Sequence, residues 1–245
     1  MLRKSLALLV LAALLTACGA SINQGIEIAD GSTVDGDLTN VNGSIRVGSD
    51  SQVTGRISNV NGSIHVGDNS RVRMINNVNG SIRVGSGVTA SGIESVNGSL
   101  SIGDGVQVGG NAGTVNGRVR GDTEIRIEGN LSTVNGSIEM GSGSEVTGMV
   151  SSTNGNINLD GVRAARLETV SGSVSLVNGS EIDGELKVRR PGRSNDTVPR
   201  IIIGVDSRVG GPLVFEREVE LFVHESAEIG EVTGAEAITF SGDEP

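Results

Sequence analysis

Histidine and cysteine, which often act as bases, nucleophiles or zinc ligands, are scarce in this sequence. Its 245 residues include two histidines, His65 and His224, and one cysteine, Cys18. A zinc site takes three or four histidine, cysteine or carboxylate ligands, and no spacing here brings such a set or a Ser-His-Asp triad together. We therefore interpret both histidines as residues of solvated faces, and we expect no catalytic residue, no metal and no cofactor.

Acidic residues recur near one turn of the chain. Asp50, Asp68, Asp104 and Asp122 follow short apolar segments, where acidic turns could bind Ca²⁺. Their positions slip by one or two residues from one segment to the next, and the sequence has no calcium-loop pattern. We interpret these residues as ordinary turn aspartates.

The composition argues against further classes of function. The chain has 3 Phe, no Trp and no Tyr, so it lacks the rings on which bases or sugars stack. Its formal net charge of -10 repels nucleic acid. We therefore expect no nucleic-acid partner, and no small-molecule substrate is indicated.

The N-terminus is predicted to direct export. Residues 1–17 begin with a basic segment and continue as an apolar stretch that is too short to span a bilayer. The stretch ends in Leu15-Thr16-Ala17-Cys18, which resembles the bacterial lipobox. The resemblance implies that Cys18 becomes the first mature residue and carries lipid, with residues 18–25 as a short tether. Gly19 replaces the aspartate that retains such lipoproteins in the inner membrane, so we expect a lipid-anchored protein of the bacterial cell envelope, at the outer membrane.

The rest of the chain is a tandem repeat. Val-Asn-Gly, or a close variant of it, recurs every 17 to 19 residues. Polar Arg46 separates Ile45 from Val47, which is the period of two of a strand with one buried face. Apolar side chains fall at five positions of each unit, which in the first unit are Val41, Ile45, Val47, Val53 and Ile57.

Units this short cannot bury their apolar side chains alone, so they must stack. The pattern predicts an all-β fold, a single-stranded parallel β-helix of 18–19-residue coils over residues 26–188, with coils about 4.8 Å apart. Crossovers in parallel sheets are mostly right-handed, so we favour a right-handed coil. A left-handed coil is the alternative, because some valines are spaced by six: Val60, Val66, Val72 and Val78.

Two columns of residues are expected to line one corner of this solenoid. Glycine there permits a positive φ, asparagine tolerates it, and stacked asparagine amides can bond along the axis. The predicted corner residues are Asn42, Gly43, Asn61, Gly62, Asn79, Gly80, Asn97, Gly98, Asn116, Gly117, Asn135, Gly136, Asn154 and Gly155.

The pattern breaks near residue 189. Residues 189–200 are predicted to form an excursion loop, and residues 201–245 to form the C-terminal coils and a cap. All three phenylalanines, Phe215, Phe222 and Phe240, lie in this last segment. They fit a cap that covers the open end of a solenoid, or alternatively a surface for self-association.

Two families share this style of repeat. Gly62-Ser63-Ile64-His65-Val66-Gly67 and Ile229-Gly230-Glu231-Val232-Thr233-Gly234 resemble the bactofilin family of polymer-forming proteins, over roughly residues 26–240. The repeat is also similar to putative-adhesin β-helix domains of bacterial surface proteins. The resemblance implies a non-catalytic module. We expect a membrane-anchored lipoprotein whose rigid β-helix is a structural or adhesive element of the envelope; the alternative is a bactofilin-like scaffold that polymerises through its coil ends.

Overall fold

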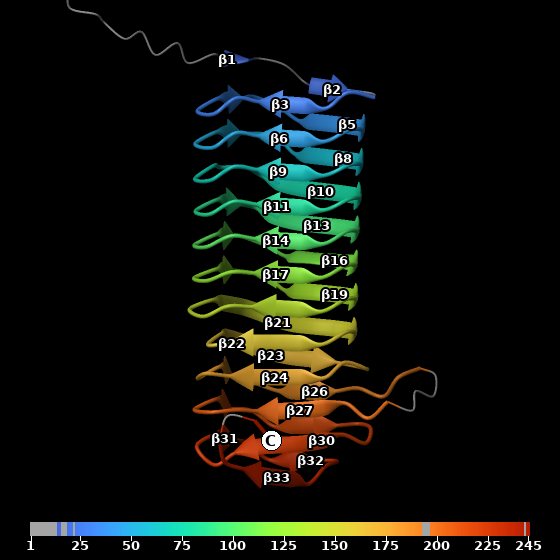
Figure 1. The fold of residues 1–245 in the computed structure, drawn as a ribbon, viewed down its shortest axis with the longest axis vertical. Helices are drawn as coiled ribbons and strands as arrows, with labels where there is room; N and C mark the ends of the chain where they lie inside the picture. The colour runs from blue at the N-terminus through green and yellow to red at the C-terminus, as the bar shows by residue number, and fades with distance from the viewer. Residues whose placement is uncertain (1–13, 16–18, 22, 193–196, 243) are drawn as a thin grey trace, which may run out of the picture.

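The computed structural model describes residues 14–15, 19–21, 23–192, 197–242 and 244–245. These residues form a parallel β-solenoid of about 11 turns, with coils about 19 residues apart and no helix. Each pairing among the named strands is parallel, so a strand bonds to its counterparts one coil above and below. The predicted β-helix is confirmed. Figure 1 shows the coils stacked into a rod, with the N-terminal coils at one end and the C-terminal coils at the other.

The first face of the rod is a sheet of twelve strands, one from each successive coil. Most of these strands are three residues long, because a corner follows directly on either side. They are β3 (Ile26–Ile28), β6 (Ile45–Val47), β9 (Ile64–Val66), β11 (Ile82–Val84), β14 (Leu100–Ile102), β17 (Val119–Gly121), β20 (Ile138–Met140), β22 (Ile157–Asp160), β24 (Val174–Val177), β27 (Arg200–Ile203), β30 (Glu220–His224) and β33 (Ala237–Phe240).

The second face is built from two-residue strands. They are β1 (Leu14–Leu15), β4 (Thr33–Val34), β7 (Gln52–Val53), β12 (Thr89–Ala90), β15 (Gln107–Val108), β18 (Arg126–Ile127), β25 (Glu181–Ile182), β28 (Arg208–Val209) and β31 (Glu228–Ile229). Isolated bridges through Arg71 join β7 to β12.

The third face carries strands of two to six residues, and in the regular coils its longer strands lead into the Val-Asn-Gly corner. They are β2 (Gly19–Ser21), β5 (Leu38–Asn42), β8 (Ile57–Asn61), β10 (Met74–Asn79), β13 (Gly92–Asn97), β16 (Ala112–Asn116), β19 (Leu131–Asn135), β26 (Leu186–Val188), β29 (Leu213–Phe215) and β32 (Val232–Thr233). Two strands, β21 (Glu145–Asn154) and β23 (Arg163–Thr169), span the second and third faces.

The sense of the coil follows from the strand directions. In Figure 1 the nearer strands β3, β6 and β9 run to the left, and the chain returns behind them as it descends. A chain that turns this way as it moves away from its N-terminus is right-handed, which is the sense that the sequence favoured.

Four of the five apolar positions in each unit fill the core. In the first unit Ile45, Val47, Val53 and Ile57 are at most 1 % exposed. The fifth position does not: Val41 is 37 % exposed, and its equivalents in the next five coils are 39 to 41 % exposed. The expectation that stacking buries this valine column is wrong, because Val60 lies three positions after the buried Ile57 and successive side chains of a strand alternate in direction.

The coil register holds through the later, less regular units. Ile182 pairs with Ala164 and Leu186 pairs with Leu167, as the repeat alignment requires. Strand β26 ends at Val188 and β27 begins at Arg200, and the predicted excursion loop lies between them. Two further coils follow, and β33 begins a third on the first face.

Candidate functional surface

The asparagines of the Val-Asn-Gly corner form a continuous amide ladder on the surface. Each Nδ2 donates to the Oδ1 of the asparagine one coil before it, as from Asn97 to Asn79 at 3.0 Å and from Asn116 to Asn97 at 2.7 Å. The ladder begins at Asn23, which accepts from Asn42 at 2.7 Å, and ends at Asn154. Its members are Asn23, Asn42, Asn61, Asn79, Asn97, Asn116, Asn135 and Asn154.

From Asn42 onward the ladder asparagines lie in strands, and none of them has a positive φ, although asparagine tolerates that conformation. The reason for glycine at the next position is mainly the close approach of the coils. A Cβ on Gly117 would lie 2.2 Å from the carbonyl oxygen of Gly98, and one on Gly136 would lie 1.8 Å from that of Gly117. The first members, including Gly43 and Gly62, also have positive φ values of 129° and 126°.

A second column of polar side chains runs inside the corner, two residues before each Asn of the ladder. Thr133 donates to the carbonyl of Gly117 at 3.1 Å, and Asn59 donates to that of Gly43 at 2.9 Å. This column therefore satisfies buried carbonyl groups that a corner leaves outside the sheet ladders. Asn40, at the first position of the column, is fully buried, and among the described residues neither of its amide atoms has a hydrogen-bond partner.

Outside the same corner, six exposed valines form a straight ridge, here called the valine ridge: Val41, Val60, Val78, Val96, Val115 and Val134. Strand pairing keeps these valines at equivalent places in successive coils. Beside the last four valines lies a groove of about 440 Å³, where Gly113 has no side chain at a position that Glu94 and Ser132 occupy in the neighbouring coils. Polar residues line the groove as well, among them Asn76, Glu94, Asn111, Asn130 and Ser132.

The aspartates near the second corner act as turn residues. The Oδ1 atom of Asp104 accepts from the backbone N–H of Thr123 at 2.9 Å and from its hydroxyl at 2.7 Å, and the backbone bond in particular lowers the pKa of Asp104. Asp68 accepts from the N–H of Ser86 at 2.9 Å. Asp50 has a φ of 55°, and Asp122 lies 3.8 Å from Arg120. Within the described ranges, no group of three His, Cys, Asp or Glu is placed to hold a metal ion.

The two histidines have different environments. His65 points outward between Arg46 and Arg83 on neighbouring coils, and partial burial, followed by these two charges, lowers its pKa. His224 is only 8 % exposed, so the expectation of a solvated residue is wrong for it. Its Nδ1 accepts from the N–H of Ser226 at 3.1 Å, and its ring packs edge-on against Phe240 with centroids 5.2 Å apart.

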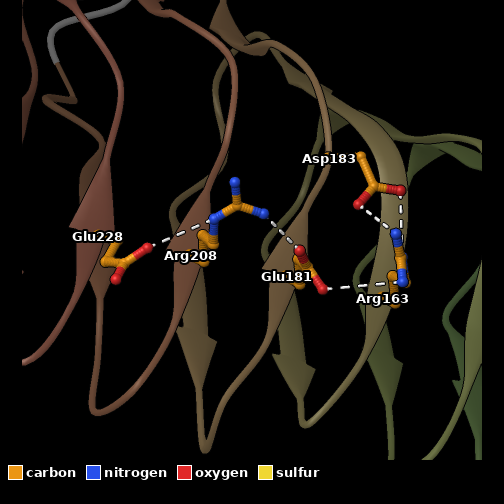
Figure 2. Close-up of polar contacts among 5 residues, drawn as sticks. All are labelled: Arg163, Glu181, Asp183, Arg208 and Glu228. Carbon is orange, nitrogen blue, oxygen red and sulfur yellow. Dashed lines mark hydrogen bonds and ion pairs between the residues drawn. The ribbon is translucent and has the colours of Figure 1, made fainter.

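Charged residues of alternating sign stack along the second face in the C-terminal half. Figure 2 shows part of this column: Arg208 Nη1 lies 2.7 Å from Glu181, and its Nε lies 3.5 Å from Glu228. Arg163 contacts Asp183 at 2.9 Å. Alternation places opposite charges directly across each strand pair, which avoids the repulsion of stacked like charges.

The three phenylalanines do not assemble into one cap. Phe215 is 5 % exposed and belongs to the core. Phe222 points outward from the first face, where the guanidinium of Arg200 lies 4.9 Å from its ring. Phe240 packs on His224. Strands β31, β32 and β33 each pair with a preceding strand only, so in the part of the chain that is described the last coil keeps an open edge.

The predicted lipidation residue, Cys18, lies outside the described residues. Strand β2 begins at the next residue, Gly19, and pairs with β5 at the N-terminal end of the rod. Of the described residues, none belongs to a helix long and apolar enough to cross a membrane.

Comparison of the chain with protein-family models, with curated proteins and with solved structures finds no match.

Proposed function

We propose that this protein is a non-catalytic, lipid-anchored module of the bacterial cell envelope, in which a rigid solenoid serves as a structural or adhesive spacer. The observation that carries the proposal is where the chain enters the rod. Strand β2 follows directly on the proposed lipidation residue Cys18 and pairs at the first coils. Lipid on Cys18 would therefore attach the rod by one end and leave its three faces free.

The dimensions and the packing suit a spacer. About 11 coils at about 4.8 Å each give a rod of roughly 50 Å. A continuous core of fully buried aliphatic side chains and an unbroken amide ladder run along most of this length. Both features resist bending, because each coil is bonded to its two neighbours along every face.

Membrane fractionation of cells that produce the full chain tests the anchor. The protein is expected in the membrane fraction, and the Cys18→Ser variant is expected in the soluble fraction with an unchanged circular dichroism spectrum. A matched variant at the other end of the rod, Ser241→Ala, is expected to stay with the membrane. Equal membrane association of wild type and Cys18→Ser would overturn the proposal.

Assembly through coil ends is the second candidate, and the open edge of the last coil favours it. Ile229 and Val232 in this coil are only partly buried, and Ile238 is 52 % exposed. An unpaired parallel edge beside apolar side chains is a template for another chain, and head-to-tail contacts of this kind make filaments. Negative-stain electron microscopy of wild type and Val232→Lys tests it: filaments that the substitution abolishes support end assembly, and short rods in both samples contradict it.

A further inference from the structure

We propose that the valine ridge and its groove form a side-by-side interface with a second copy of this chain. This interface lies on the long side of the rod and uses neither the coil ends nor the anchor. It therefore stands or fails separately from both functions proposed above.

The fold itself does not require these valines. Their side chains are 37 to 41 % exposed on six successive coils. The next coil carries Thr153 at the equivalent position, with Asn154 still bonded in the amide ladder. A polar residue therefore satisfies the corner equally well, and six exposed valines in register need another explanation.

The surface around the valine ridge carries little charge. The corner strip consists of residues 39–44, 58–63, 76–81, 94–99, 113–118 and 132–137, and it contains just two charged residues, Glu94 and Arg118, in a chain of net charge -10. Asparagine, serine and threonine fill most of the remaining positions. This is the face on which two acidic rods can approach each other with the least repulsion.

The valine ridge and the groove beside it have complementary shapes. The groove beside the ridge is lined by the last four ridge valines and by polar residues that include Glu94, Asn111 and Asn130. Ridge and groove lie side by side and share the repeat of the coils. A two-fold axis through this face would place the ridge of each copy in the groove of the other, which is the reciprocal contact of an isologous dimer.

The charge distribution orients the pair. Residues 121–245 hold 21 of the 29 acidic residues and 10 of the 19 basic ones, whereas residues 18–120 hold 8 and 7. Parallel rods would place the two acidic halves beside each other. Antiparallel rods separate them, so we expect copies that are free of the anchor to run in opposite directions. Two copies anchored through Cys18 in one membrane would instead have to run parallel.

Sedimentation equilibrium of the full chain in mild detergent, with Cys18→Ser to remove the lipid, tests the interface. We expect a reversible dimer. The strip is only about 30 Å long, so the contact area is small, as in weak complexes. The double variant Val96→Asp/Val115→Asp should weaken dimerisation at least about tenfold. The matched control Ser101→Asp/Asn158→Asp adds the same charge to the first face. It should change the dissociation constant of the dimer by less than about twofold.

A second variant guards against misfolding. Val96→Thr/Val115→Thr keeps the shape and strand preference of valine and should weaken the dimer while the melting temperature of the monomer stays unchanged. A concentration-independent monomer for the Cys18→Ser chain would overturn the interface. Equal weakening by the strip variants and by the first-face control would overturn it as well.

Disulfide crosslinking tests the orientation. In the Cys18→Ser background an introduced cysteine is the sole thiol of the chain. Antiparallel pairing predicts rapid crosslinking of Val96→Cys, near the centre of the ridge, and slow crosslinking of Val41→Cys at its end. Equally rapid crosslinking at both sites would overturn the antiparallel arrangement, and rates no faster than that of Ser101→Cys would overturn the interface itself.

Discussion

Replacing Gly117 by alanine tests whether close coil spacing, and not turn conformation, fixes the glycine column. The added Cβ would lie 2.2 Å from the carbonyl oxygen of Gly98 and 2.6 Å from its carbonyl carbon. Both atoms belong to backbone, so no side chain can rotate away. An ordinary contact needs the two coils to separate by about 1 Å at this corner.

That separation acts on the bonds that join the coils. The N–H of Gly98 donates to the carbonyl of Asn116 at 2.9 Å, and the N–H of Gly117 donates to that of Asn135 at 3.1 Å. Loss of one or two such bonds, with their groups left inside the corner, costs about 2–4 kcal/mol. At about 2–4 °C per kcal/mol for a chain of this size, the melting temperature should fall by roughly 5–15 °C.

Two further glycines provide matched controls in the same thermal melts, followed by circular dichroism. A Cβ on Gly109 would meet no atom closer than 3.9 Å, so Gly109→Ala should change stability by less than about 1 kcal/mol. Gly105 has a φ of 66° and open space around it, so Gly105→Ala should lose about 1–2 kcal/mol from conformation alone. A Gly117→Ala melt that coincides with that of Gly109→Ala would refute the close-packing account.

Three other perturbations follow from the surface columns. Asn97→Ala removes the amide hydrogen bond to Asn79 at 3.0 Å and the one that Asn116 donates from the next coil. Because water can replace both bonds, a thermal melt should show a loss of stability of only about 1–2 kcal/mol. An unchanged melt would contradict a stabilising role for the ladder. The pKa of Asp104 is lowered in the folded state, so its stabilising contribution is present above its unfolded pKa of about 4 and disappears as the pH falls through the folded value. Asp104→Asn should therefore be less stable than wild type at pH 7, and the difference should narrow as the pH falls below about 4; a difference that stays constant in acid would contradict the role of the Thr123 bond. Arg208→Gln breaks two exposed ion pairs and should lower stability by less than about 1 kcal/mol, with the difference lost in 1 M salt; a larger, salt-independent loss in urea unfolding would contradict a surface role.

The architecture of this protein is predictable from sequence because each local signal repeats in every coil. Ile45 and Val47 predict a strand with one buried face, and their recurrence at a fixed interval leaves stacking as the way to bury them. The amide ladder is predictable for the same reason, since a fixed coil length brings each asparagine above the last.

The features that the sequence did not predict depend on which side of the chain faces inward. Val60 is as apolar as Ile57, but it lies an odd number of residues away and is 39 % exposed. Counting the parity from Ile57 would have placed Val60 outside and Asn59 inside. Elsewhere in each coil, two-residue strands and corners interrupt the alternation of side chains, so their direction is hard to count along the sequence. An assignment from apolar character alone therefore placed Val60 on the wrong side of the strand.

The close approach at Gly117 and the burial of His224 are tertiary properties. Gly117 differs from a turn glycine through the position of Gly98, which is 19 residues earlier in sequence and directly above it in space. His224 is covered because Phe240 returns beside it one coil later. The residues that neighbour Gly117 and His224 in the sequence do not predict either contact.

Mass spectrometry of the N-terminal peptide of the protein from bacterial membranes tests the central claim most directly. A chain that begins at Cys18 and carries the added mass of a diacylglyceryl group and an acyl chain is the predicted result. An unmodified Cys18, or a mature chain that begins at another residue, would contradict an envelope module held by lipid at one end of its rod.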